Sequence, residues 1–169
     1  MHDPDETVLD EELTRAMTPF SQKPGDVTAL RNRLQDVMWE DVGVMRDADG
    51  LHRGLKRIAE IDDELSSVGV AADNLAFNLS WHDWLNLRSL IDMSMVIAKA
   101  ALSRENSRGA HFREDFPDAG TMQESYFTLA SGYGDAISVT RAPVQFTIVK
   151  PGETLLGEDE AETLIKAAQ

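Results

Sequence analysis

The fold of this chain is decided between residues 80 and 102, where the sequence reads SWHDWLNLRSLIDMSMVIAKAAL. Apolar residues recur there at intervals of three and four, which places them along one face of an α-helix. Further apolar positions widen that face, and such a helix is usually central to its domain. Ser80 with Asp83 three positions later resembles a capping box, so we expect the helix to begin at Ser80. The predicted seam is formed by Trp84, Leu87, Ile91, Met95, Ala98 and Leu102.

Two more amphipathic helices precede this one. Asp26 follows the turn Lys23–Gly25 and suits the N-cap of a helix. A second helix is predicted to begin around Asp47 and to end at Gly69. Three long helices joined by short connections predict a three-helix bundle. The two apolar stripes comprise Leu30, Leu34, Val37, Met38 and Val42, and Leu51, Leu55, Ile58, Ile61, Leu65 and Val68.

The pattern changes after Gly109, where β-branched and aromatic residues replace the helical periodicity. Short helices are expected at both ends of the chain, between Val8 and Met17 and between residues 157 and 169. The predicted fold is mainly α, or α+β by content, with a three-helix bundle followed by a small antiparallel β element. The β-rich runs are 126–129, 136–140 and 144–149.

The 169 residues match one compact domain in size. We divide the chain into an acidic N-terminal segment (1–25), a helical domain with its β appendage (26–150) and an acidic C-terminal tail (151–169). The net charge of −14 argues against nucleic-acid binding, which needs clustered lysine and arginine. Because the sequence contains no cysteine, disulfides, thiolate metal ligands and iron–sulfur clusters are excluded.

The sequence shows no leader and no membrane span. It begins with an acidic stretch, unlike the basic and apolar start of a signal peptide. The most apolar stretch, from Leu90 to Leu102, contains Asp92 and Lys99 and is too short to cross a bilayer. We therefore expect a soluble, cytoplasmic protein.

We predict no metal site, no catalytic residue and no cofactor-binding residue on this chain. The four histidines lack the spacing and the carboxylate neighbours of a metal site. No glycine-rich turn of the dinucleotide-binding kind occurs, and Ser131–Asp135 is interpreted as a hairpin turn between two strands. Trp39, Trp81 and Trp84 lie on or beside helix stripes and are predicted to pack in the core.

One segment is unusual for an acidic protein: residues 104–117 read RENSRGAHFREDFP and hold three arginines and a histidine. Arginine suits carboxylate binding, so an anion site is one interpretation. The interpretation we favour is an ion-pair network that fixes the loop after the helix, or an interface. In that network Arg104, Arg108 and Arg113 would pair with Glu105, Glu114 and Asp115.

The same segment resembles the R-x-E-S-R-G-A-H-x-R-x-D-F-P signature of succinate dehydrogenase and fumarate reductase flavoproteins, which L-aspartate oxidases share more loosely. Asn106 departs from it, because the family commonly has glutamate directly before the serine. Residues 34–47, LQDVMWEDVGVMRD, are similar to the family's L-Q-x-x-M-W-E-x-V-G-V-x-R-D stretch. The two matches come in the family's order, and the resemblance covers about residues 26 to 150.

The resemblance implies a C-terminal three-helix module that ends in a small β element. Enzymes of this family interconvert succinate and fumarate by hydride transfer to FAD, and their FAD-binding and substrate residues lie in parts that this chain does not contain. No catalytic residue is therefore carried over. The resemblance implies that the motif docks the module on the flavin-bearing body. The candidate interface residues are Arg104, Glu105, Arg108, Gly109, His111, Arg113 and Asp115.

Three hypotheses follow for the function. In the first, the chain is a small subunit, not catalytic alone, that docks on a separate FAD-binding flavoprotein subunit lacking its own C-terminal domain. In the second, it is a free-standing binding or regulatory module whose loop from Arg104 to Arg113 holds a carboxylate ligand or an acidic protein. In the third, it is a fragment of a longer polypeptide. Only the first and third make it a non-catalytic part of an oxidoreductase.

Overall fold

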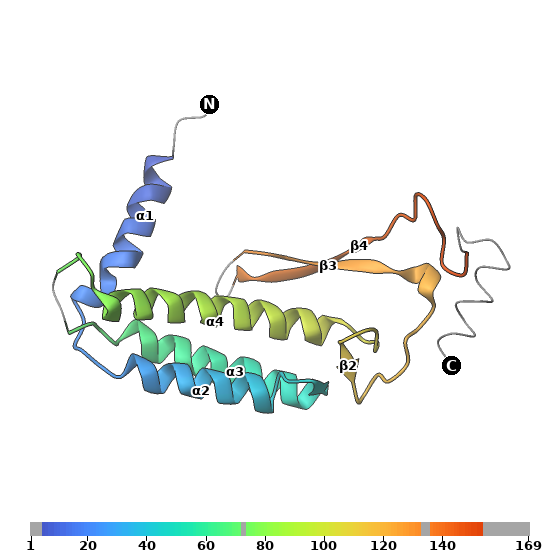
Figure 1. Ribbon diagram of the computed structural model, residues 1–169, viewed down its shortest axis with the longest axis horizontal. Helices are drawn as coiled ribbons and strands as arrows, with labels where there is room; N and C mark the ends of the chain where they lie inside the picture. The colour runs from blue at the N-terminus through green and yellow to red at the C-terminus, as the bar shows by residue number, and fades with distance from the viewer. Residues whose placement is uncertain (1–4, 72–73, 133–135, 154–169) are drawn as a thin grey trace.

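The computed structural model describes residues 5–71, 74–132 and 136–153. Three helices lie side by side as the predicted bundle, and a β-hairpin runs along the last of them, which lies between the hairpin and the other two helices (Figure 1). The fold is mainly α with a small β element, as predicted. No helix in these ranges is long and apolar enough to cross a membrane. The helices are α1 (Glu6–Met17), α2 (Val27–Glu40), α3 (Ala48–Ser66) and α4 (Leu79–Ser103).

The hydrophobic core lies between α2, α3 and α4. The apolar stripes predicted from the sequence point into it, and Met95 and Leu102 of the predicted seam pack at its margin. Burying a leucine or isoleucine side chain contributes about 1.5–3 kcal/mol, so these stripes are the main source of stability. The most deeply buried members are Leu30, Leu34, Val37, Val42, Leu51, Ile58, Ile61, Leu65, Trp84, Leu87, Ile91 and Ala98.

Side-chain caps fix where the bundle helices begin. The predicted caps are confirmed for α2, where Asp26 accepts a hydrogen bond from the Ala29 amide, and for α3, where Asp47 caps the first turn. The predicted start of α4 at Ser80 is wrong. The N-cap is Asn78 instead. Its side-chain oxygen accepts from the amide of Trp81, the third residue of the helix, at 3.0 Å.

Helix α3 also ends earlier than predicted, at Ser66 instead of Gly69. Gly69 lies where the chain after α3 passes close to the backbone around Lys23, and its amide donates to the Lys23 carbonyl at 2.9 Å. A Cβ on Gly69 would lie 2.2 Å from the Gln22 carbonyl oxygen. The glycine is therefore needed for this close approach and is not a helix cap.

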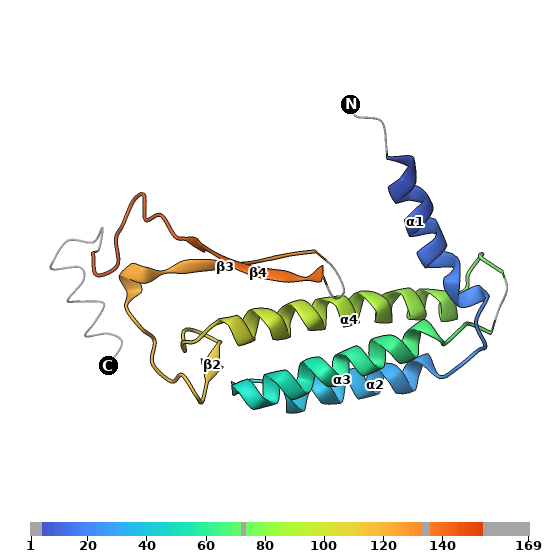
Figure 2. The ribbon, with the colours of Figure 1, turned by 180° about the vertical axis from the view of Figure 1, so that it is seen from behind.

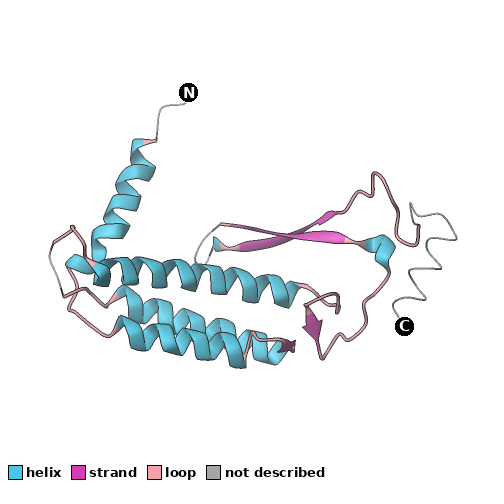
Figure 3. Ribbon diagram, viewed as in Figure 1, coloured by secondary structure: helices cyan, strands magenta, loops and turns pink. Residues whose placement is uncertain are grey.

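Two short strands, β1 (Met45–Arg46) and β2 (Phe112–Arg113), form a parallel pair that the sequence did not predict. Met45 is paired with Phe112, and Arg46 with Arg113. Figure 3 shows this pair at the end of the bundle where α4 finishes. The ladder thus brings the two family-like motifs, far apart in the sequence, into direct contact.

The β element is a hairpin of β3 (Tyr126–Ser131) and β4 (Ser138–Pro143), which Figure 2 shows from behind. Arg141 donates to the Ser103 carbonyl and lies over the Tyr126 ring, which holds the hairpin near the end of α4. The third predicted run, 144–149, is wrong as a strand. Pro143 ends β4, and the next amide turns back to the Ser125 carbonyl.

Other predictions lie partly or wholly outside the described residues. The hairpin turn is described only up to residue 132 and again from 136, and the expected C-terminal helix falls beyond residue 153. The expected N-terminal helix is confirmed as α1, which stands away from the bundle in Figure 1. Although described along its whole length, α1 buries no residue.

The three tryptophans have different environments, so the prediction that all pack in the core is wrong for one of them. Trp84 is buried and donates to the Val68 carbonyl at 2.8 Å. Trp81 is half-buried and donates to the Ala16 carbonyl at 2.8 Å, which ties the base of α1 to α4. Trp39 is 79% exposed, because it lies beside the α2 stripe on the outer face of the helix.

Candidate functional site

Arg113 closes the C-terminal end of α4. Its side chain is only 1% exposed, and Nη1 donates to the carbonyls of Ala101 and Leu102 at 3.1 Å and of Arg104 at 3.3 Å. The last carbonyls of a helix have no partner within the helix and carry the negative end of its dipole. A buried guanidinium satisfies both requirements, so Arg113 stabilises the point where the chain leaves α4.

Asp115 neutralises Arg113 and extends the connection to α3. The two side chains form a bidentate pair, with Nε to Oδ1 at 2.7 Å and Nη2 to Oδ2 at 2.6 Å. This hydrogen bonding lowers the pKa of Asp115 to about 2. Oδ2 also accepts from the amide of Ala48, the first residue of α3, at 3.0 Å. The predicted pairing of Arg113 with Asp115 is confirmed, and it joins the end of α4 to the start of α3.

Arg108 binds backbone instead of a carboxylate, so its predicted pairing with an acidic neighbour is wrong. Nε donates to the Ala119 carbonyl, Nη2 to the Thr121 carbonyl at 2.6 Å, and Nη1 to the Ser125 hydroxyl at 3.1 Å. We call residues 104–117 the motif loop. Arg108 is therefore the residue that holds the connection between the motif loop and the hairpin. Carbonyls converge on it because this connection curves around the guanidinium.

Gly109 forms the turn within the motif. Its φ is +59°, in the left-handed region that glycine adopts without strain. On either side of it, Arg108 and His111 exchange two backbone hydrogen bonds, at 2.9 and 3.1 Å. Glu105, the remaining acidic candidate, is exposed and makes no hydrogen bond or ion pair within the described part of the chain. The turn thus presents His111 to the bundle.

His111 lies between Arg46 and the end of α4. The Arg46 Nη1 atom is 3.0 Å from Nδ1 of the ring, and Nε2 is 3.3 Å from the Arg104 carbonyl. Because arginine can only donate, Nδ1 accepts and Nε2 carries the proton that it donates to that carbonyl. Burial lowers the pKa of His111, and the charges of Arg104, Arg46 and Arg113 lower it further. We therefore assign His111 as neutral at pH 7.

Arg46 and Arg104 form an uncompensated pair of cations beside this histidine. Arg46 donates to the Val42 carbonyl at 3.0 Å and to His111, and burial together with the Arg104 charge lowers its pKa. The Arg104 guanidinium forms no hydrogen bond or ion pair with any residue that the structure describes. Both line an open hollow of 450 Å³ that also includes Arg108, His111 and Thr128 of β3.

Sequence reasoning missed Arg46 as a site residue. The signal was present, because Arg46 belongs to the upstream stretch that resembles the family. Without the parallel ladder, nothing in the sequence indicated that this stretch meets the second motif. In contrast, Asn106, where the sequence departs from the family pattern, has a shielded amide oxygen without a partner among the described residues, and we have no physical account of it.

A second arginine cluster surrounds Asp41, the C-cap of α2. Asp41 is buried, and its carboxylate accepts from Arg53 at 2.7 and 2.8 Å and from Arg57 at 2.7 Å. Arg57 also reaches Glu40 at 2.7 Å. This cluster ties the end of α2 to α3, and here the carboxylate and its two cations all belong to the domain.

Comparison with known proteins identifies the family. A family model described as the C-terminal part of the fumarate reductase flavoprotein matches residues 31–155. The chain belongs to this family. The resemblance inferred from the two motifs is therefore confirmed.

Relatives and solved structures agree with this membership. An uncharacterized FAD-dependent oxidoreductase of Methanocaldococcus jannaschii is 32% identical over 69% of this chain and 21% of its own length. The fumarate reductase flavoprotein subunit of Mycobacterium tuberculosis is 27% identical over 86% of this chain and 25% of its own length. The Sdh1 structure of Mycobacterium smegmatis superimposes with a TM-score of 0.73 at 27% identity, over 85% of this chain and 25% of that one.

The quinol fumarate reductase of Escherichia coli shares the fold, with a TM-score of 0.76 at 20% identity over 90% of this chain and 27% of that one. The present chain thus spans about a quarter of the length of the relatives that it matches. Its described residues include no group of three or more histidine, aspartate or glutamate side chains placed to hold a metal ion.

Proposed function

We propose that the chain is the C-terminal structural domain of an FAD-dependent oxidoreductase of the succinate dehydrogenase and fumarate reductase type. In this proposal it docks on a separate flavin-bearing subunit, which carries the FAD, and it is not catalytic alone. The observation that carries the proposal is the family match to a C-terminal flavoprotein region over residues 31–155. The relatives are flavoprotein subunits or FAD-dependent oxidoreductases, which favours this function over a free-standing binding module.

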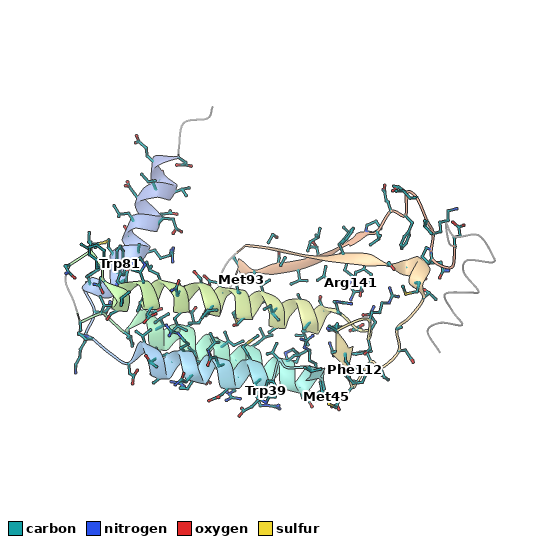
Figure 4. All side chains as sticks on the ribbon, viewed as in Figure 1. Trp39, Met45, Trp81, Met93, Phe112 and Arg141 are labelled. Atoms are coloured by element: carbon teal, nitrogen blue, oxygen red, sulfur yellow. The ribbon has the colours of Figure 1, made fainter. Side chains whose placement is uncertain are left out.

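Exposed apolar side chains at the motif end of the bundle support docking. Trp39, Val44, Met45 and Phe112 are 79%, 70%, 64% and 39% exposed, and we call these four the apolar patch. Figure 4 shows Trp39, Met45 and Phe112 toward the same end of the helical bundle. Large apolar side chains that gather on a surface mark a site of protein contact. Covering them with a partner removes apolar area from water.

The candidate interface residues divide into two groups under this proposal. Arg108, Gly109, Arg113 and Asp115 shape and brace the motif loop through contacts within the domain. The Arg104 guanidinium forms no hydrogen bond or ion pair with the described residues and remains available to a partner. The first group thus supports docking indirectly, by holding the loop in place.

The proposal is tested by purifying a tagged version of the chain gently from its native host. We expect a yellow partner in equal amount that contains FAD-binding and substrate domains and lacks this C-terminal module. We expect the chain alone to be colourless and to show no dehydrogenase activity with dicarboxylates. Bound flavin or activity in the isolated chain, or its recovery without any partner, would overturn the proposal.

A matched pair of variants then tests the apolar patch. Met45→Ser removes an exposed side chain from the patch, whereas Leu13→Ser removes one of similar exposure, 61%, from α1. We expect Met45→Ser to weaken binding of the flavin-bearing subunit by about tenfold, the scale of one buried apolar side chain, and Leu13→Ser to leave it unchanged. Equal effects of the two variants would show that the patch is not the docking surface.

A further inference from the structure

We propose that Arg46 and Arg104, beside the ring of His111, form a receptor for a single carboxylate side chain on the surface of the flavin-bearing subunit. This inference rests on the proposed function and deepens it, because it names the chemical group that the partner must place at one position. We call these two arginines the carboxylate receptor.

The first argument is the unbalanced charge. The Arg46 guanidinium donates to a carbonyl and a neutral ring, and the Arg104 guanidinium donates to no described residue, so neither cation forms an ion pair within the described domain. Burial and the nearby Arg104 charge both disfavour the charged form of Arg46 and lower its pKa. One carboxylate placed in the hollow between them would relieve this repulsion and accept charge-assisted hydrogen bonds.

The second argument concerns the shape of the hollow. It measures 450 Å³, is open to solvent, and lies between the end of α4 and β3. A site for a small ligand encloses most of that ligand's surface, which an open hollow cannot do. A side chain that projects from a protein surface needs no such enclosure, since its own protein covers the opening.

The third argument is continuity with the apolar patch. In the β1–β2 ladder, Met45 is exposed while the next residue, Arg46, turns inward to His111. On the paired strand, Phe112 is exposed and Arg113 is buried. A partner that covers Met45 and Phe112 is thereby brought next to Arg46. Apolar contact and cationic pair thus belong to one surface.

The net charge of −14 indicates what the carboxylate receptor contributes to docking. An acidic residue on the partner is repelled by most of this domain and attracted only where cations are uncompensated. Complementary charges of this kind contribute to orientation and specificity more than to affinity. The carboxylate receptor therefore fixes how the domain is oriented on the flavin-bearing subunit.

The test measures binding of the co-purified flavin-bearing subunit to Arg104→Glu and to Lys56→Glu. Lys56 lies on α3, 80% exposed, so the second variant makes the same change in net charge at another place. We expect Arg104→Glu to weaken binding by about thirtyfold and Lys56→Glu by less than twofold. Because the Arg104 guanidinium forms no hydrogen bond or ion pair with a described residue, both variants should keep the melting temperature of the unmodified chain.

A crosslinking experiment identifies the partner group. Arg104→Lys retains the charge and supplies an amine, which a carbodiimide condenses with a nearby carboxylate to an amide with loss of water. We expect one crosslink to an aspartate or glutamate of the flavin-bearing subunit, located by mass spectrometry and absent with Arg104→Gln. A crosslink confined to this chain would overturn the inference.

The outcomes separate the inference from the proposed function. If the unmodified chain recovers no flavin-bearing subunit, the proposed function fails. If it recovers that subunit and Arg104→Glu binds it equally well, only the receptor fails. If succinate binds the isolated chain saturably by calorimetry and this binding is lost in Arg104→Gln, the occupant is a small dicarboxylate and the commitment to a protein side chain is overturned.

Discussion

Arg46 and Arg113 are partners in the same two-residue ladder, yet their surroundings differ completely. Arg113 is buried, is neutralised by Asp115 and holds the end of α4. Arg46 is only half-buried and faces a neutral ring and a second cation, Arg104. Arginine beside a carboxylate of its own domain serves the fold, whereas arginine without one is available to a partner.

The cluster around Asp41 resembles Arg113, because its arginines are neutralised by a carboxylate of the same domain. There a buried carboxylate is held by two arginines that belong to the same domain. Burying a charge is costly unless it is paired and hydrogen-bonded, so such clusters are completed internally. We call an arginine closed where a carboxylate of its own domain neutralises it, and open where none does. Three variants, each with a matched control, test this division.

The largest effect is expected for Arg113→Ala. It leaves Asp115 without its partner and the last carbonyls of α4 without a donor, so the free energy of unfolding should fall by about 3–5 kcal/mol. Urea unfolding followed by circular dichroism measures this change. Arg104→Ala, a few residues away, is the matched control and should change stability by less than about 0.5 kcal/mol. Similar losses for both variants would remove the distinction between closed and open arginines.

A smaller effect is expected for Asp41→Ala. It removes hydrogen bonds from Arg53 and Arg57, but both guanidinium groups are partly exposed and regain water, so the expected loss is about 2 kcal/mol. Asp36→Ala, an exposed change on the same helix, should be neutral within about 0.5 kcal/mol. If Asp41→Ala were equally neutral in thermal melts, the Asp41 cluster would not contribute to the stability of the domain.

The smallest effect is the pH dependence from His111. Its pKa in the folded chain lies below the ordinary 6.5, so between these values the unfolded chain binds the extra proton. Stability is therefore complete above pH 6.5 and falls as the pH decreases below it. Urea midpoints between pH 5 and 8 should show this slope for the unmodified chain and for His52→Asn, and a flatter one for His111→Asn. An unchanged slope in His111→Asn would contradict our protonation assignment.

This slope is separate from that of Asp115, whose pKa is also lowered on folding but lies in a much more acidic range. Its pKa is lowered from 3.8 to about 2, so the unfolded chain binds the proton first. The stability that the Arg113–Asp115 pair contributes is complete above pH 3.8 and is lost as the pH falls toward 2. The pH range from 5 to 8 therefore reports on His111 without a contribution from this pair.

The bundle could be predicted from the sequence because its signals are local. The stripe containing Leu30 and Leu34 repeats at helical spacing, and Asp26 and Asp47 cap helices that directly follow them. The start of α4 was misplaced because Ser80 and Asn78 are both good caps two positions apart. Trp39 was assigned to the core because its neighbour Met38 belongs to the stripe.

The candidate site could be predicted only in part, because its geometry depends on contacts between distant residues. The motif loop was found from its composition and its family resemblance. The position of Arg46 depends on a parallel pairing of two-residue strands, which are too short to have a periodicity. Two of the three partners of Arg108 are backbone carbonyls, which any residue can supply, so no side-chain pattern reveals them.

The parallel ladder has a consequence for folding kinetics. The bond between Ala48 and Asp115 joins residues 67 positions apart, whereas α3 and α4 are neighbours in the sequence. Closing a long loop costs more entropy than closing a short one, so we expect the helices to associate first and the β1–β2 ladder, with the Ala48–Asp115 bond, to form after the transition state. Contacts that form late slow unfolding without speeding folding. The family-like motif would therefore govern chiefly how long the folded domain survives, and only weakly how fast it folds.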